Sequence, residues 1–377
     1  MRRAFSRVCI ALGLTLAGCG ELPSEGPVLS DVQTVHNNSN SAGFLLIDLS
    51  AEVADHLKNQ TPPSMNDKFG KGRPFTSSRI GVGDVISVQI WEADPGGLFS
   101  SAGSVNRGVV PNSTVDSSGR IMVPFAGSVR AAGRTTRQLS QLIARRLEKK
   151  TVDPQVHVSI VKNRANTVSV TGGVRKPSIV PLTNKGLDLL DVVATVGGSK
   201  FPSYASRVSL NRRGKIGTAY LSHLISSPSD NIYLKPGDKI HIEKVPQSFS
   251  AFGAVARKGK EDFGAAKLSV LEGIGKVSGL KDRQADPRGV FLLRFEKART
   301  AYLLAKMPYD DRRKLVPVIY RIDLKNPNQY FFAQAIQLHD KDVIYVANAP
   351  SVELDKFLTI IGKGMGIGIR AYNTATP

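Results

Sequence analysis

The stretch that decides the fold is VTGGVRKPSIVPLTNKGLDLLDVVATVGGS at 170–199, because it recurs without a gap as AFGAVARKGKEDFGAAKLSVLEGIGKVSGL at 251–280. The offset is constant at 251 − 170 = 81 residues. A repeat of this length is typical of a duplicated supersecondary unit. The identical pairs are Gly172 and Gly253, Val174 and Val255, Leu187 and Leu268, Leu190 and Leu271, Val196 and Val277, and Gly198 and Gly279.

Helix signals recur at matching positions of the two copies. Asp188 with Asp191, and Ser269 with Glu272, have the spacing of an N-cap residue and its reciprocal partner in the first helical turn. A glycine follows each helix where a C-terminal cap would lie. The copies also end alike, as LKPGDKIHIEKVP (234–246) and LHDKDVIYVANAP (338–350). We therefore expect two homologous domains at 168–246 and 250–350, the second with a basic, partly helical insertion near 296–314.

A further domain is expected before the repeats, at 79–166. VISVQIW at 85–91 alternates apolar and polar residues with period two, which predicts a strand. A hairpin is expected around Ser118-Gly119, and Thr135 with Gln138 has the spacing of a capping box that opens a helix. Strands and helices mixed in this way predict a multidomain α+β protein.

The N-terminus has the pattern of a bacterial lipoprotein signal. MRRAFSR is basic, VCIALGLTL is apolar but too short to span a bilayer, and Leu16-Ala17-Gly18-Cys19 resembles a lipobox. We expect residues 1–18 to be a signal peptide and Cys19 to be the lipidation site. An ordinary signal with an incidental cysteine is the alternative. Residues 19–78 are rich in Ser, Asn, Gly and Pro, which predicts an extended leader with one short helix near 51–58.

The C-terminal segment 352–377 is expected to form an amphipathic transmembrane helix. Its apolar side chains recur at steps of three and four. Nineteen helical residues reach about 28 Å, close to the thickness of a bilayer core. Several copies in a ring could turn this stripe to lipid, whereas a packing or interfacial helix is the alternative. The stripe is Leu354, Phe357, Leu358, Ile361, Met365, Ile369 and Tyr372.

The net charge and the motifs of the sequence limit which functions are possible. The formal charge is +20, or 20 − 3 = +17 once Arg2, Arg3 and Arg7 leave with the signal. The sequence has no nucleic-acid-binding signature, so an anionic polymer or lipid fits this charge better. The six histidines are dispersed, and no HExxH, GxSxG or Walker motif is present. We therefore predict no catalytic residues, no metal site and no cofactor, and no nucleic-acid partner.

An aspartate recurs at the start of a strand in each of the three domains. These residues are Asp84, Asp238 and Asp342. A catalytic role would require them to converge, whereas turn capping needs only local hydrogen bonds. We therefore interpret them as turn caps.

The chain resembles the Wza-like outer-membrane polysaccharide export family. The resemblance rests on the lipobox, RIGVGDVISVQIWE with VDSSGRIMVPFAGSV, the duplicated unit and the amphipathic tail. It implies that 79–166 is a polysaccharide export domain and that the repeats are β-grasp-like SLBB domains. It also implies a homo-oligomeric, octameric ring with a helical barrel in the outer membrane. The expected partners are outer-membrane lipid, capsule or exopolysaccharide cargo, and an inner-membrane polysaccharide co-polymerase.

Three functions remain open from the sequence. The first is a conduit that exports polysaccharide, with most of its mass in the periplasm and a lipid anchor in the outer membrane. The second is a periplasmic glycan-binding lipoprotein whose tail only docks. The third is an envelope assembly factor without a pore.

Overall fold

The computed structural model contains two compact units. One is formed by Thr61–Pro246, and the other by Met1–Gln60 together with Gln247–Pro377. The first unit contains two apolar cores, one in each of its two domains, and the second unit is built around one large core. The residues that the structure describes are 26–30, 32–33, 44–60, 64–76, 79–92, 98, 107–183, 185–310 and 312–350.

The domain at 79–166 combines a three-stranded antiparallel sheet, a two-stranded hairpin and one helix. The sheet order is β3-β2-β6, and β4 pairs with β5. The expected alternation is confirmed, because every second residue of β2 is buried. The expected hairpin position was wrong: the hairpin turns at 124–126, and the turn at 117–119 only leads into β4. The elements are β2 Val85–Trp91, β3 Arg107–Thr114, β4 Arg120–Val123, β5 Gly127–Arg130, α5 Thr136–Leu147 and β6 Gln155–Lys162.

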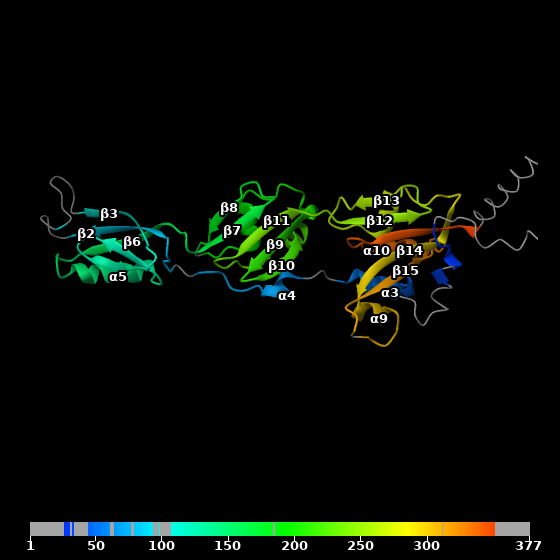
Figure 1. Cartoon of the computed structure of the whole chain (residues 1–377), viewed down its shortest axis with the longest axis horizontal. Helices are drawn as coiled ribbons and strands as arrows, with labels where there is room; N and C mark the ends of the chain where they lie inside the picture. Colours follow the sequence, from blue (N-terminus) through cyan, green and yellow to red (C-terminus); the bar gives the residue numbers. More distant parts are fainter. Residues whose placement is uncertain are drawn as a thin grey trace, which may run out of the picture. The chain divides into compact units, whose positions relative to one another are not determined.

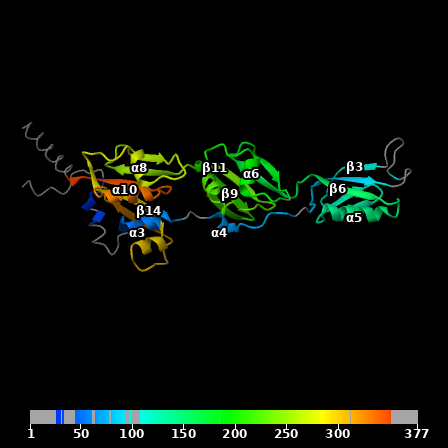
Figure 2. The ribbon, with the colours of Figure 1, turned by 180° about the vertical axis from the view of Figure 1, so that it is seen from behind.

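The first repeat is a five-stranded mixed sheet in the order β10-β9-β11-β7-β8. Its first and last strands, β7 and β11, are parallel neighbours in the centre of the sheet. Figure 2 shows α6 in front of this sheet, and its apolar side packs into the core of the repeat. The elements are β7 Thr167–Gly172, β8 Ser178–Pro181, α6 Leu189–Thr195, η1 Ser203–Ala205, β9 Ser206–Arg212, β10 Lys215–Tyr220, α7 Leu221–Ser226 and β11 Lys239–Lys244.

The second repeat has the same strand order, β15-β14-β16-β12-β13, which confirms the duplication at the level of topology. β12 and β16 are again parallel central neighbours. The expected insertion helix is α9, which packs on β14 and β15. The elements are β12 Ser248–Gly253, β13 Gly259–Asp262, α8 Val270–Lys276, β14 Ala285–Lys297, α9 Ala298–Leu304, β15 Leu315–Ile322, α10 Pro327–Ala335 and β16 Val343–Asn348.

The described residues of the predicted leader contribute to both repeats instead of forming an extended leader. β1 (Leu45–Asp48) adds a sixth strand, parallel to β15. α3 (Ala51–Lys58), the one helix expected here, is confirmed, and it packs on α10 (Figure 1). α4 (Met65–Phe69) instead packs on β10 of the first repeat. The extended interpretation was wrong for these residues, because their apolar side chains complete cores that the repeats leave open.

The predicted helix caps are confirmed. Reciprocal capping boxes join Thr135 to Gln138, Asp188 to Asp191 and Ser269 to Glu272. The glycines expected to stop the repeat helices, Gly198 and Gly279, have φ of +78° and +77°. The content is mixed helix and sheet over several domains, so the α+β multidomain class is confirmed. The exact domain boundaries stay predictions.

Candidate functional site

The three recurrent aspartates are turn caps, as predicted. In each case a carboxylate oxygen accepts a hydrogen bond from the backbone N–H three residues earlier. The distances are 2.9 Å for Asp84, 2.9 Å for Asp238 and 2.7 Å for Asp342. All three carboxylates are buried, each at the start of a strand in a different domain. They therefore fix turns rather than form one catalytic group.

Each repeat also holds an arginine against its turn aspartate. Arg212 on β9 donates to both carboxylate oxygens of Asp238, with the shortest contact at 2.7 Å. Arg294 on β14 does the same to Asp342, at 2.6 Å. Each guanidinium also donates to the backbone carbonyl five residues before its aspartate. Bidentate pairing of this kind gives strong geometric specificity, so it locks the last strand of each repeat to its neighbour.

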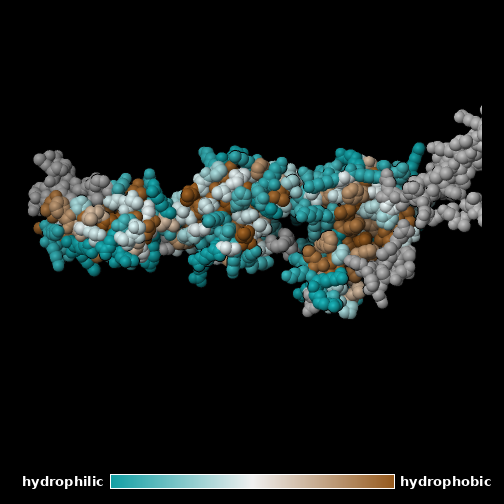
Figure 3. Space-filling view, viewed as in Figure 1, coloured by the Kyte–Doolittle hydropathy of each residue, from teal (hydrophilic) through white to brown (hydrophobic). Residues whose placement is uncertain are grey.

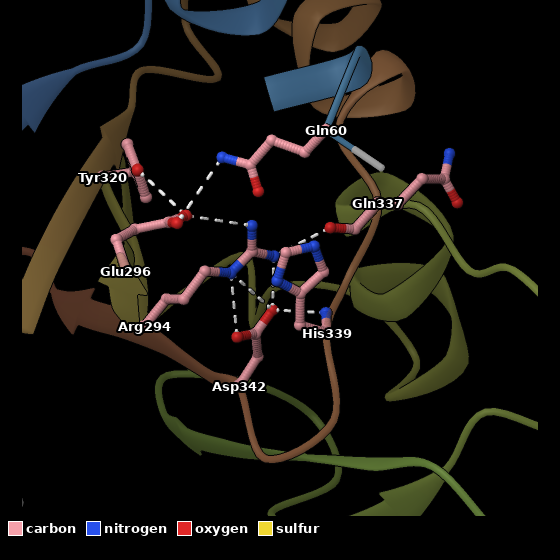
Figure 4. Close-up of polar contacts among 7 residues, drawn as sticks. All are labelled: Gln60, Arg294, Glu296, Tyr320, Gln337, His339 and Asp342. Atoms are coloured by element: carbon pink, nitrogen blue, oxygen red, sulfur yellow. Dashed lines mark hydrogen bonds and ion pairs between the residues drawn. The ribbon is translucent and has the colours of Figure 1, made fainter. Parts of the chain in front are cut away.

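In the second repeat this pair is the centre of a larger polar cluster (Figure 4). Arg294 lies 3.5 Å from Glu296, which also accepts a hydrogen bond from the hydroxyl of Tyr320. The side chain of Gln60, from the end of the N-terminal segment, donates to the same carboxylate. Arg294, Glu296 and Asp342 have side chains no more than 4% exposed. The cluster therefore fastens the N-terminal segment to the second repeat from within.

Two titratable groups respond to this cluster. Burial, with the nearby Glu296 carboxylate, raises the pKa of Tyr320 far above its ordinary value. His339 is exposed as a residue, but its ring lies against the cluster. Partial loss of water and the charge of Arg294 lower the pKa of His339 to about 4. Both side chains therefore stay neutral around pH 7.

A second buried carboxylate attaches α4 to the first repeat. Asp230 accepts hydrogen bonds from the hydroxyl of Ser64, the backbone N–H of Asn66 and the ring of His223, the last at 2.7 Å. Ser64 is also the N-cap of α4. Burial opposes ionisation of Asp230, but these hydrogen bonds outweigh it and lower its pKa. The ionised carboxylate therefore stabilises the attachment of α4.

We expect this attachment to weaken in acid. A carboxyl whose pKa is lowered on folding contributes stability above its unfolded pKa, near 3.8, and loses that contribution as pH falls through the folded value. The protection of the backbone amides of residues 64–76 against hydrogen exchange, relative to their intrinsic exchange rates at each pH, should therefore fall below about pH 4. Asp230→Asn should show faster exchange already at pH 7. If that variant exchanges like the unmodified chain at pH 7, the attachment does not depend on this carboxylate.

Beyond α4, the chain forms one wall of an open cavity on the first repeat. The cavity has a volume of about 820 Å³ and is lined by residues 73–76, by 211–214 at the β9–β10 turn and by 235–239 before β11. Arg213 and Gly214 have φ of +51° and +85°, as a tight hairpin turn between β9 and β10 requires. Arg212 and Asp238 form its buried floor. Its rim is rich in cations.

Comparison with known proteins gives the family. The model of the family described as polysaccharide biosynthesis/export protein matches residues 74–161, and the SLBB domain model matches 166–242. The capsule polysaccharide export outer membrane protein CtrA of Neisseria meningitidis serogroup A is 33% identical, over 98% of this chain and 99% of its own length. The chain belongs to the family of polysaccharide export outer membrane proteins.

Two further relatives in the polysaccharide export family have similar coverage. The capsule polysaccharide export protein BexD of Haemophilus influenzae is 33% identical over 94% of both chains. The Vi polysaccharide export protein VexA/TviF of Salmonella typhi is 28% identical over 85% of this chain and 87% of its own length. The resemblance to a Wza-like export family is thereby confirmed.

For this member of the polysaccharide export family, the predicted site residues lie outside the described residues. Cys19 and the stripe from Leu354 to Tyr372 are in the segments 1–25 and 351–377. Within the described ranges, no helix is both long and apolar enough to cross a bilayer. The same ranges contain no group of three His, Cys, Asp or Glu residues that could hold a metal ion.

The sequence interpretation missed the arginines of the two Arg–Asp pairs. Arg212 lies 26 residues before its aspartate, whereas Arg294 lies 48 residues before its own, because the second repeat carries the insertion. A gapless comparison of the repeats could not align them. Arg294 lies 294 − 212 = 82 residues after Arg212, one more than the offset of the repeat. An alignment that allowed one extra residue before Arg294 and placed the insertion after β14 would have brought both arginines into register.

Proposed function

We propose that this chain exports a capsular or extracellular polysaccharide across the outer membrane. The observation that carries the proposal is the 33% identity to a capsule polysaccharide export outer membrane protein over nearly the whole of both chains. Coverage of this kind includes the export domain, both repeats and both ends. It favours an export conduit over a glycan-binding lipoprotein or an assembly factor without a pore.

We propose further that the protein acts as a lipid-anchored ring. Cys19 would carry the lipid, most of the mass would lie in the periplasm, and the segment 352–377 would cross the outer membrane as an amphipathic helix. Several copies would enclose a wet path for sugar while the apolar stripes face lipid. An inner-membrane polysaccharide co-polymerase would deliver the polymer.

Exposed apolar side chains support contacts between copies. Phe295 on β14 is 72% exposed, and Leu315 lies on the same face of the adjacent strand, 56% exposed. Leu303 on α9, which packs against both strands, is 59% exposed. Figure 3 shows apolar surface gathered on the unit that contains these elements. Neighbouring apolar side chains of this kind are typical of surfaces that become buried on association.

One experiment tests the conduit with a matched pair of variants. Leu358→Asp places a charge on the apolar stripe, whereas Thr359→Asp places the same charge beside it. We expect Leu358→Asp to abolish surface polysaccharide on intact cells, because a charge facing lipid costs about 2–4 kcal/mol in each copy. Thr359→Asp should retain most of the surface polysaccharide at equal protein level.

Deletion of residues 352–377 should abolish surface polysaccharide, as Leu358→Asp does, and should leave a folded periplasmic protein. Unchanged surface polysaccharide after that deletion would contradict the spanning tail. Unchanged surface polysaccharide after deletion of the whole gene would contradict export itself.

A further inference from the structure

The cavity on the first repeat carries more positive charge than its structure requires. Arg212 forms an ion pair with Asp238, so the charges of these two residues cancel at the floor of the cavity. The remaining charged residues of the lining are Arg73, Arg213, Lys235 and Lys239, and all four are exposed. None of the four has an ionic partner in the described part of the chain. Four unpaired cations around one hollow repel each other, and a bound anion would relieve that repulsion.

The second repeat shows that these cations are not needed for the fold. It keeps the turn aspartate, the bidentate arginine and the same strand order. However, His339 stands where the first repeat has Lys235, and Val343 stands where it has Lys239. The hairpin turn that carries Arg213 is replaced there by the insertion with α9. The shared pair is therefore structural, whereas the cationic rim belongs to the first repeat alone.

The cavity also has the shape and the surfaces that a sugar chain requires. It is open, and its volume of about 820 Å³ could hold a short run of hexoses rather than a single ion. Phe75 lines it and is half-buried against the core of the repeat, so the ring is held in place and offers an apolar surface. Sugar rings combine an apolar face with polar edges, and this lining provides both.

The wall that carries Arg73 and Phe75 is held by specific contacts. The backbone carbonyl of Lys71 accepts a hydrogen bond of 3.1 Å from the N–H of Tyr233. Phe69 lies under the guanidinium of Arg212, with its ring centroid 5.4 Å from Cζ. Because these contacts fix the chain at the C-terminal end of α4, directly before Arg73, the cavity exists before a ligand binds, which lowers the entropic cost of binding.

We propose that this cavity binds a negatively charged segment of a glycan, with the rim cations contacting acidic groups and Phe75 contacting a sugar ring. The inference rests on the proposed export function, which it narrows to acidic polysaccharides. The cavity would hold the polymer transiently, since exposed charge pairs are individually weak. Binding should weaken as ionic strength rises, because salt screens exposed charges.

The test measures binding of hexagalacturonate to the purified full-length protein in detergent. Maltohexaose is the neutral glycan of equal length, and hexaglutamate is an anion without sugar. Lys235→Glu/Lys239→Glu reverses two rim charges. Lys200→Glu/Lys244→Glu makes the same change in net charge at the opposite end of the sheet. Lys244 is about 16 Å from Lys239 along β11. The backbone N–H of Lys200 donates to the carbonyl of Gly173, which follows the end of β7 that pairs with Ile242. All four lysines are exposed, so both double variants should fold.

We expect hexagalacturonate to bind more tightly than either other probe. The rim variant should weaken its binding by at least about tenfold, and the control variant by less than about twofold. Arg213→Asn, which suits a residue with φ of +51°, should weaken it by a smaller factor. An equal loss of hexagalacturonate affinity in the two double variants would overturn the assignment of the site to this cavity. Binding of hexaglutamate as tight as that of hexagalacturonate would overturn the preference of the site for glycans.

The outcome separates this inference from the export function. If rim variants bind hexagalacturonate normally while deletion of the gene removes surface polysaccharide, the cavity assignment fails and the export function stands. If deletion of the gene leaves surface polysaccharide unchanged, the export function fails whatever the cavity binds.

Discussion

Replacing Arg294 with alanine is expected to destabilise the second repeat by about 3–5 kcal/mol, because it leaves Asp342 and Glu296 buried without their cation. Both carboxylates are no more than 4% exposed, so water cannot replace the guanidinium. The measurement is the free energy of opening from hydrogen exchange of the β14 and β16 amides. Amides of β9 and β11 in the first repeat serve as the internal reference and should not change.

Arg207→Ala is the matched control for Arg294→Ala. Arg207 also pairs with a carboxylate on the neighbouring strand, Glu243, at 2.8 Å, but both side chains are about 40% exposed. Its loss should cost no more than about 1 kcal/mol. Arg294→Lys should lie between the two, since an ammonium keeps the charge but cannot form the bidentate pair. Equal costs for Arg294→Ala and Arg207→Ala would show that the cluster does not stabilise the repeat.

Gly253→Ala is expected to be the other strongly destabilising change, at more than about 3 kcal/mol. Gly253 ends β12 with φ of +79°, and a Cβ there would lie 2.0 Å from the carbonyl oxygen of Val346 on β16. Because the obstacle is backbone, the two parallel strands would have to separate. Hydrogen exchange of the β12 and β16 amides measures the loss.

The duplication supplies both a replicate and a control. Gly172 has the same role in the first repeat, with φ of +87° and a Cβ position 2.1 Å from the carbonyl oxygen of Ile242. Gly279 and Gly198 also have positive φ, but nothing lies within 4 Å of their Cβ positions. Alanine at either control should cost only about 1–2 kcal/mol, the strain of the left-handed backbone. Equal effects at Gly253 and Gly279 would mean that strand contact is not what requires glycine.

The sequence by itself determined the features that depend on neighbouring residues. The three capping boxes, the buried face of β2 and the turn aspartates all rest on hydrogen bonds or side-chain alternation within a few residues. Such contacts form wherever the local backbone is helical or extended, so spacing alone predicts them. The duplication was visible for the same reason, since each copy repeats its local signals.

Only the tertiary structure decided which distant segments meet. Asp48 pairs with Arg321, 273 residues later, so β1 completes a sheet that no local pattern assigns to it. Arg294 on β14 forms an ion pair with Asp342 at the start of the neighbouring strand β16. Residues 73–76 lie beside the β9–β10 turn, and the two segments together line the cavity. Strand partners are selected by how whole faces bury apolar area, which is a property of the folded chain. The cavity and the buried cluster could therefore not be located from spacing along the sequence.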